Sequence, residues 1–238
     1  MSLPLVIAHR GDSVNALENS PDAIRRALSY PVDMIELDVR SSLDNALFVM
    51  HDRTTARTAS ASVDIERSTA AEISEVRLKN GEPVPTLTDV FGVVAGNAGL
   101  NLEIKSDGAG LLTAEFLASS DYPGYVLVSS FKEMEVLAFR RVRPHHPTSL
   151  IFDVFAARDV PAYRESGYRI ISLRKTAVSR GLIEACHEQG VQVYVWTVDD
   201  EEEMKKIISW GADGIYSNRP GALKEIVRNS ESSAGNDK

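Results

Sequence analysis

Short unbroken runs of hydrophobic residues recur along the chain, and segments whose hydrophobic residues lie three or four positions apart separate them. Unbroken runs are typical of parallel strands buried on both faces, whereas the spaced pattern is typical of helices with one buried side. Eight such strands are expected, beginning near positions 5, 34, 100, 125, 148, 169, 191 and 213. Helices are expected at 22–29, 87–94, 110–119, 132–141, 179–188, 200–210 and 221–228, with a shorter helical segment before the strand at 169.

Strands that alternate with helices predict right-handed crossovers and a parallel sheet. Eight such units in 238 residues match the (β/α)8 or TIM barrel, an α/β fold. A doubly wound open sheet is the alternative, but the turn after the first strand, His9-Arg10-Gly11-Asp12, lacks the glycine pattern of dinucleotide-binding turns. We therefore predict one barrel domain over residues 1–228, followed by a disordered polar tail at 229–238.

One strand does not fit the simple repeat. The hydrophobic run at 47–50 follows the strand at 34–39 too closely for a helix to lie between them, so the two are expected to form a hairpin. Residues 53–85 are polar and irregular, with one short helix near 70–75. So short a segment has little material for a core of its own. We predict a small insertion that lies over one face of the barrel.

Composition and net charge exclude some classes of binding partner. Twenty-six basic and 34 acidic residues give a net charge of −8, which argues against nucleic acid and anionic membranes as partners. An anionic small molecule remains compatible if a metal reverses the local charge. No hydrophobic run approaches the roughly 20 residues of a membrane span, and no signal-peptide pattern begins the chain. A single cysteine, Cys186, fits a reducing compartment. We expect a cytoplasmic protein; the sequence leaves room for a homodimer.

Polar residues cluster at the carboxyl ends of the expected strands, which is where barrels carry their catalytic groups. Charged side chains inside a barrel are costly unless they are paired or bind a metal. The residues at these ends are His9, Arg10, Glu36, Asp38, His51, Glu103, Lys105, Ser129, Ser130, Trp196, Ser217 and Asn218.

Three carboxylates are candidates for a metal site. Glu36 and Asp38 lie two positions apart and so share one strand face, about 6.5–7 Å apart, and Glu103 comes from the next barrel strand. Three converging carboxylates repel one another unless a cation lies between them. Oxygen ligands favour one divalent cation, Mg²⁺ or Ca²⁺, with Mn²⁺ as a third candidate. The alternative is a set of salt bridges to Arg10, Arg40 or Lys105, and the spacing leaves both open.

His9 and His51 each end a hydrophobic strand. Two histidines beside a metal-bound anion suit one general base and one general acid, and the alternative is that both only cap strands. Arg10 and Lys105 could neutralise a phosphate or pair with the carboxylates, and Trp196 could form the wall of a substrate pocket or part of the barrel rim. Gly11 is expected to leave room in the turn beside the phosphate.

Seven motifs occur in this order between residues 5 and 228, and together they resemble the glycerophosphodiester phosphodiesterase family. They are His9-Arg10-Gly11, Glu18-Asn19-Ser20, Glu36-Leu37-Asp38, His51-Asp52, Glu103-Ile104-Lys105, Val195-Trp196-Thr197-Val198 and the segment 211–218. The resemblance implies a (β/α)8 barrel with an insertion after the second histidine, which is where 53–85 lies. The insertion is short, as in cytoplasmic-type members. The departures, Ser20 for threonine and altered turns at 41–45 and 217–220, remove no ligand and no histidine.

The resemblance also implies roles for the site residues. Glu36, Asp38 and Glu103 match the metal ligands, His9 and His51 the catalytic histidines, and Arg10 and Lys105 the phosphate contacts. The expected reaction is metal-dependent hydrolysis of a glycerophosphodiester to glycerol 3-phosphate and an alcohol, with His9 as base and His51 as acid, or the reverse. One alternative is a phosphodiesterase for lysophospholipid or phosphoinositol-type head groups. A non-catalytic metabolite-binding barrel is another, but a binder does not need two proton-transfer groups.

Overall fold

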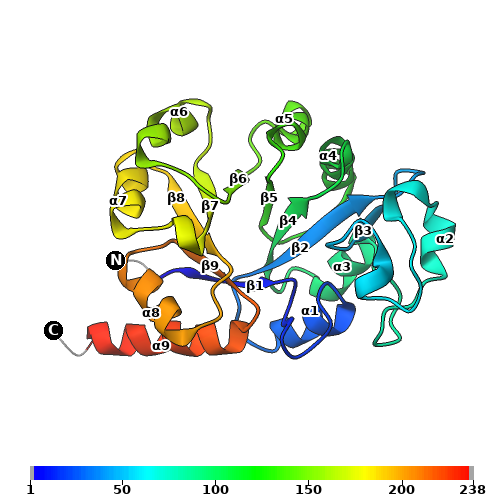
Figure 1. Ribbon diagram of the computed structural model, residues 1–238, viewed down its shortest axis with the longest axis horizontal. Helices are drawn as coiled ribbons and strands as arrows, with labels where there is room; N and C mark the ends of the chain where they lie inside the picture. The colour runs from blue at the N-terminus through cyan, green and yellow to red at the C-terminus, as the bar shows by residue number, and fades with distance from the viewer. Residues whose placement is uncertain (1–2, 236–238) are drawn as a thin grey trace.

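The computed structural model describes residues 3–235, with side chains as far as residue 230, and shows a closed parallel barrel surrounded by helices (Figure 1). Along the sheet the barrel strands run β1-β9-β8-β7-β6-β5-β4-β2, and β1 pairs with β2 to close the barrel. The predicted (β/α)8 fold is therefore confirmed. The barrel strands are β1 (Leu5–His9), β2 (Met34–Ser41), β4 (Gly99–Ile104), β5 (Val126–Ser130), β6 (Thr148–Phe152), β7 (Ile170–Arg174), β8 (Gln192–Trp196) and β9 (Gly214–Ser217).

The helices follow the predicted pattern except at the end of the chain. They are α1 (Pro21–Leu28), α2 (Ala70–Ser74), α3 (Leu87–Val94), α4 (Ala109–Ser119), α5 (Glu133–Val142), α6 (Val160–Glu165), α7 (Arg180–Glu188), α8 (Glu201–Ser209) and α9 (Pro220–Gly235). The last helix, α9, continues to Gly235, past position 229 where the polar tail was expected to begin, and 236–238 lie outside the described residues. Extending an existing helix adds one hydrogen bond per residue, and no proline or glycine interrupts 222–234.

Strand alternation divides the side chains of the barrel between two environments. In β1, Val6 and Ala8 belong to the hydrophobic core between the strands and the helices, whereas Ile7 belongs to a second cluster inside the barrel. Tyr194 and Tyr216 are the large residues of that inner cluster. The inner cluster also holds Met34, Leu127 and Ile170. The barrel is thus a packed core whose polar groups gather at the carboxyl ends of the strands.

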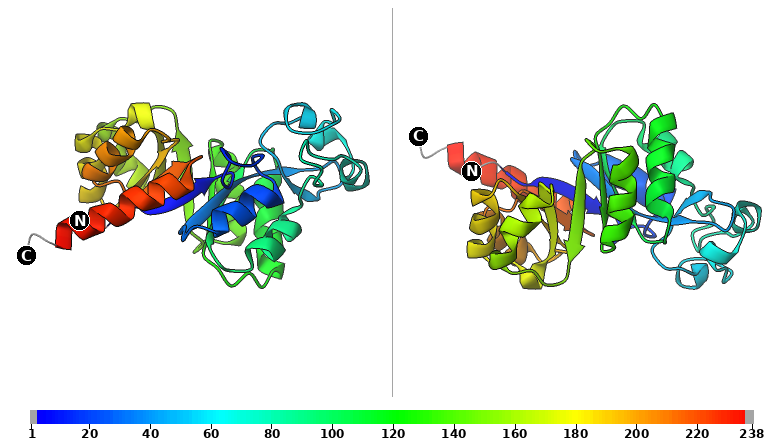
Figure 2. Two further views of the ribbon diagram at one scale, coloured as in Figure 1. Left: turned by 90° about the horizontal axis from the view of Figure 1, so that it is seen from below. Right: turned by 90° about the horizontal axis from the view of Figure 1, so that it is seen from above.

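The predicted hairpin is confirmed, since β3 (Leu47–Val49) pairs antiparallel with β2. Residues 53–85 form a lobe at one end of the molecule, opposite the end of α9 (Figure 2). The lobe contains α2 and the short 3-10 helices η1 (Thr55–Arg57) and η2 (Ile65–Arg67). Contrary to expectation the lobe has a small hydrophobic cluster, because Phe48 and Met50 of the hairpin supply large side chains to it. The other buried members are Ala59, Ile65, Ile73, Val76, Leu78 and Val84.

The turn after β1 requires glycine for a reason the sequence did not reveal. Gly11 has a φ of +85°, and a Cβ there would lie 2.6 Å from the carbonyl carbon of Ala23 and 2.7 Å from its oxygen. The side chain would therefore collide with α1, not with a phosphate as expected. The same turn places Arg10 at a φ of 60° and lets its N–H donate to the backbone oxygen of Glu36 at 2.9 Å.

Replacing Gly11 with alanine should destabilise the protein more than the same change at Gly81, which has the same φ of +85° but no atom within 4 Å of an added Cβ. Both variants should lose about 1–2 kcal/mol of unfolding free energy to the left-handed backbone, and Gly11→Ala about 1–3 kcal/mol more to overpacking. Urea denaturation of both variants measures the difference. Equal losses of unfolding free energy in the two variants would show that α1 moves to accommodate the added Cβ without a measurable loss of stability.

Candidate active site

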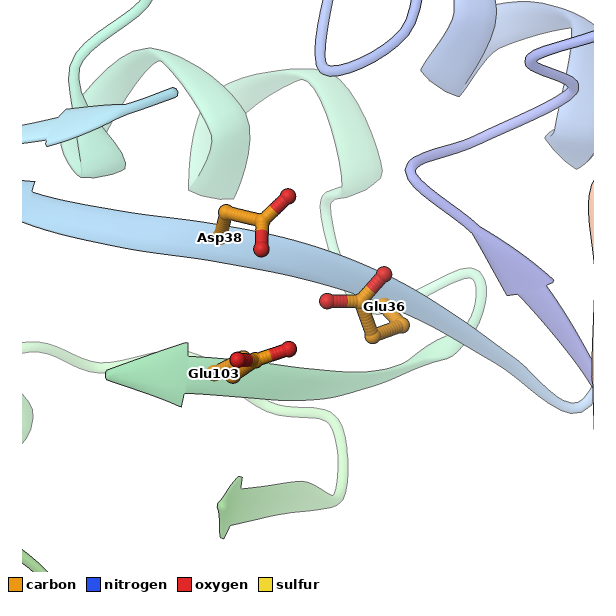
Figure 3. A group of neighbouring side chains, drawn as sticks. All are labelled: Glu36, Asp38 and Glu103. Carbon is orange, nitrogen blue, oxygen red and sulfur yellow. The ribbon is translucent and has the colours of Figure 1, made fainter. Parts of the chain in front are cut away.

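Three carboxyl groups meet between the middle of β2 and the carboxyl end of β4 (Figure 3). The strand register places Asp38 opposite Glu103, and one ligand oxygen from each of the three residues lies within 4.8 Å of the others. Glu36 is 2% exposed, Asp38 0% and Glu103 8%. Between them Leu37 points outward into the main core, so the alternation predicted for β2 directs both carboxylates into the barrel.

Two positively charged side chains, Arg10 and Lys105, contact the acidic cluster, which is the group of Glu36, Asp38 and Glu103. The Nε of Arg10 lies 3.1 Å from Oδ2 of Asp38, and Nζ of Lys105 donates to Oε1 of Glu103 at 2.7 Å and lies 3.4 Å from Oδ1 of Asp38. Burial alone would raise the pKa of Asp38, but Arg10 and Lys105 hold that pKa below its usual value. Arg40, the third predicted salt-bridge partner, does not join them.

Glu36 behaves differently from Asp38. Burial, and then the charges of Asp38 and Glu103, raise the pKa of Glu36 well above its usual value. Oε1 of Glu36 and Oδ1 of Asp38 are buried without a hydrogen-bond donor in the described part of the chain. Buried polar atoms of this kind are rare because leaving them unpaired is costly. Carboxylate oxygens at this separation fit a hard divalent cation, which would satisfy both orphaned atoms.

The tautomer of His9 follows from its neighbours. Nδ2 of Asn218 donates to Asp199 at 2.7 Å, so the amide oxygen Oδ1 faces His9 and accepts from its Nδ1 at 2.7 Å. The proton is therefore on Nδ1, and Nε2 has a free lone pair 3.8 Å from Oε2 of Glu36. Burial, and then the charge of Arg10, lower the pKa of His9 to about 4, so the imidazole is neutral.

His51 follows β3 and is held at two points. Its Nδ1 lies 2.7 Å from Oδ1 of Asp52, and its carbonyl accepts two hydrogen bonds from Arg40, from Nε at 2.9 Å and Nη2 at 2.7 Å. Arg40 also donates to Glu66 of the insertion at 2.7 Å, which explains why it is not part of the acidic cluster. A ring whose Nδ1 faces a carboxylate leaves Nε2 to the cavity that His51 lines.

A cavity of about 180 Å³ joins these groups. At its mouth the rings of Phe131 and Trp196 pack edge to face, with centroids 5.5 Å apart. At its floor the hydroxyl of Tyr216 accepts a hydrogen bond from Asn101 at 3.0 Å. The cavity is lined by His9, Arg10, Glu36, His51, Asn101, Glu103, Lys105, Phe131, Ile151, Ser172, Trp196, Thr197 and Tyr216. Of the eight residues assigned from the sequence to the metal, to catalysis or to the substrate, all but the fully buried Asp38 line this cavity.

Several residues around the site gave only weak signals in the sequence. Asn19, known only from its motif, donates to Asp38 at 2.8 Å. The sequence placed Asn218 at a strand end but assigned it no role, because its partner His9 lies far away in the sequence. No sequence pattern pointed to Asp199 or Arg57, because each contacts the site only through another side chain. Ser130, also at a strand end, donates to the backbone of Ile104 and is structural.

Comparisons with known proteins agree with this arrangement. Residues 9–222 match the glycerophosphoryl diester phosphodiesterase family. A glycerophosphodiester phosphodiesterase of Caldanaerobacter subterraneus subsp. tengcongensis is 32% identical over 238 residues, which span 94% of this chain and 98% of the relative. Among solved structures, a glycerophosphodiester phosphodiesterase of Agrobacterium tumefaciens has a TM-score of 0.81 and 26% identity, covering 94% of this chain and 100% of its own.

An Oleispira antarctica phosphodiesterase, solved in complex with its product sn-glycerol-3-phosphate, has a TM-score of 0.88. It is 22% identical to this chain, and the superposition covers 95% of this chain and 97% of the other, so it supports the fold. Between residues 3 and 235, no helix has the length and hydrophobicity needed to cross a membrane. The full-length match shows that the chain belongs to the glycerophosphoryl diester phosphodiesterase family and is an enzyme of that class.

Proposed function

We propose that this protein hydrolyses small glycerophosphodiesters to glycerol 3-phosphate and an alcohol. The observation that carries the proposal is the meeting of His9, His51, two cations and the acidic cluster around one cavity of about 180 Å³. That volume suits a glycerophosphoryl group with a small head group. The Oleispira antarctica relative, whose structure contains sn-glycerol-3-phosphate, supports the same product class.

Arg10 and Lys105 would bind the phosphate, because both line the cavity and carry positive charge. Trp196 would bind the rest of the substrate, since its buried Nε1 has no acceptor in the described part of the chain. A divalent cation held by Glu36, Asp38 and Glu103 would act as a Lewis acid toward a phosphate oxygen.

Two proton transfers accompany release of the alcohol in the proposed reaction. The lone pair on Nε2 of His9 would accept a proton from the attacking hydroxyl, and a protonated His51 would donate one to the departing alkoxide. The anchoring of Nδ1 of His9 on Asn218 supports the first role, and the carboxylate of Asp52 beside His51 supports the second. Attack by the 2-hydroxyl of the substrate's own glycerol is favoured over attack by water, because that nucleophile is already positioned. This attack expels the alcohol and leaves a cyclic glycerophosphate. Water would then open the ring to glycerol 3-phosphate, with His51 accepting the proton of the water and His9 returning a proton to the 2-oxygen.

A turnover assay of glycerophosphocholine, glycerophosphoethanolamine and glycerophosphoglycerol with Mg²⁺, Mn²⁺ and Ca²⁺ tests the proposal. We expect glycerol 3-phosphate from at least one substrate in the presence of a divalent cation. Binding of all three substrates without product would contradict the proposed reaction with these head groups.

The cavity mouth supports one alternative substrate class. Phe131 is 46% exposed beside Trp196, and this hydrophobic edge could contact an acyl chain. Phe152, the last residue of β6, packs instead against Phe155 and Tyr163. Lysophosphatidylcholine belongs in the same assay. A larger kcat/KM for lysophosphatidylcholine than for glycerophosphocholine would favour a lysophospholipid phosphodiesterase.

A further inference from the structure

We propose that Arg57, in the insertion, is a positioning residue that orients His51 through Asp52. The inference rests on the proposed role of His51 as a proton donor. None of the described residues that line the cavity lies between 53 and 85, so the insertion contributes no direct contact there. Arg57, at the end of η1, nevertheless reaches the site through one intervening side chain.

The guanidinium of Arg57 is bound on two sides. Nε donates to Oδ2 of Asp52 at 2.7 Å, and Nη1 and Nη2 donate to the two carboxylate oxygens of Glu18 at 2.7 and 2.6 Å. The two parallel bonds to Glu18 fix the plane of the guanidinium. A fixed guanidinium then determines where the carboxylate of Asp52 points.

Both oxygens of Asp52 are used in this arrangement. Oδ2 accepts from Arg57, and Oδ1 lies 2.7 Å from Nδ1 of His51. The hydrogen bond from Arg57, and to a lesser extent the contact with His51, lower the pKa of Asp52 to about 2, so the acceptor remains a carboxylate. A carboxylate at Nδ1 holds the proton on that nitrogen and fixes the ring plane, which directs Nε2 to the cavity.

Glu18 connects the same arrangement to the phosphate side of the site. Its Oε1 also accepts from Nη1 of Arg10 at 2.9 Å. Arg10, Glu18, Arg57, Asp52 and His51 therefore form a continuous chain of contacts around the cavity. Arg10 retains its own contact with Asp38, so loss of Arg57 should disturb His51 more than the phosphate site.

The surroundings of Arg57 show how the insertion holds it. The carbonyl of Arg57 accepts a hydrogen bond from Nζ of Lys79 at 2.6 Å, and the N–H of Lys79 donates to Thr58 at 2.9 Å. The side chain of Arg57 is 47% exposed, and surface ion pairs of this kind contribute little to stability. Its replacement should therefore change activity without unfolding the protein.

The test compares Arg57→Ala with Arg53→Ala. Arg53 has the same 47% side-chain exposure and lies on the same segment, but it pairs with Asp64 and Glu66 inside the insertion. We expect Arg57→Ala to lower kcat about 10–100-fold, the range observed when a group that orients a metal ligand is removed, with a small change in KM. Arg53→Ala should leave kcat near wild type. Arg57→Lys should recover part of the loss, because an ammonium can still donate to Asp52.

Nitrogen-15 NMR of the histidine rings gives a readout that does not depend on turnover. The signals of His51 are those missing from His51→Ala. At a pH where the ring is neutral, we expect only the Nδ1–H tautomer of His51 in the wild type and in Arg53→Ala, and a mixture of ring tautomers in Arg57→Ala. An unchanged His51 tautomer together with a wild-type kcat in Arg57→Ala would overturn the proposal.

A double variant separates this inference from the proposed function. If Arg57 acts through His51, adding Arg57→Ala to His51→Ala should lower kcat no further. An additional loss equal to that of Arg57→Ala alone would show that Arg57 acts elsewhere. Wild-type turnover in His51→Ala itself would instead reject the acid–base role and leave the NMR result to decide whether Arg57 orients the ring.

Discussion

The variants His9→Ala and His51→Ala should each have a kcat about 10²–10⁴-fold below that of the wild type, because this is the usual contribution of one general acid or base. The two rings line the same cavity, but their Nδ1 atoms have different hydrogen-bond partners, which are Asn218 for His9 and Asp52 for His51. Neither residue can therefore substitute for the other. Steady-state assays give kcat, and circular dichroism with thermal unfolding confirms that each variant folds.

A third histidine serves as the control. His187 is exposed on α7 and pairs with Asp213 at 2.8 Å, so His187→Ala should retain wild-type turnover. Wild-type turnover in His9→Ala or His51→Ala would remove that residue from the mechanism.

The leaving group distinguishes acid from base. A nitrophenolate departs without a proton, so a diester that carries one does not need the general acid. With that substrate His51→Ala should lose much less activity than with glycerophosphocholine, whereas the loss in His9→Ala should persist. The opposite pattern would exchange the two roles.

Local sequence patterns were enough to place most of the site. The alternation in β2 sends Glu36 and Asp38 to one face, and the hydrophobic runs before His9 and His51 mark both as strand-end residues. Because barrel closure brings strand ends together, these patterns predicted which side chains would meet without any knowledge of distances. Within the strands, periodicity selects the side chains that face the interior of the barrel, among them Glu36, Asp38 and Glu103.

The contacts that orient those side chains could not be predicted in this way. His9 and Asn218 are 209 positions apart and meet only because β1 pairs with β9. Glu18 and Arg57 are 39 positions apart and meet because the insertion folds back over the turn after β1. Side-chain contacts at such separations depend on the final packing of the chain, which no local pattern records. The missed hydrophobic cluster of the insertion has the same origin, since Phe48 and Met50 lie outside the segment.

Removing divalent cations should lower both the activity and the stability of this protein. A cation that binds only the folded state stabilises it by about 2.7 kcal/mol at a concentration 100 times its dissociation constant. We therefore expect EDTA treatment to lower Tm and abolish turnover, and addition of Mg²⁺, Mn²⁺ or Ca²⁺ to restore both. Full activity in the stripped protein would reject the metal site.

Glu36→Gln tests whether the acidic cluster is the binding site. Without a cation, wild-type Glu36 is a buried carboxyl group whose pKa is raised by burial, Asp38 and Glu103, so an uncharged glutamine should be tolerated at least as well. With a cation the order should reverse, because the variant lacks one ligand. The Tm of Glu36→Gln should therefore be equal to or above that of the wild type without the cation, and below it when the cation is present. Glu202→Gln, at a residue with 81% side-chain exposure that pairs with Lys205, should respond to the cation as the wild type does. An undiminished stabilisation of Glu36→Gln by the cation would place its binding outside the cluster.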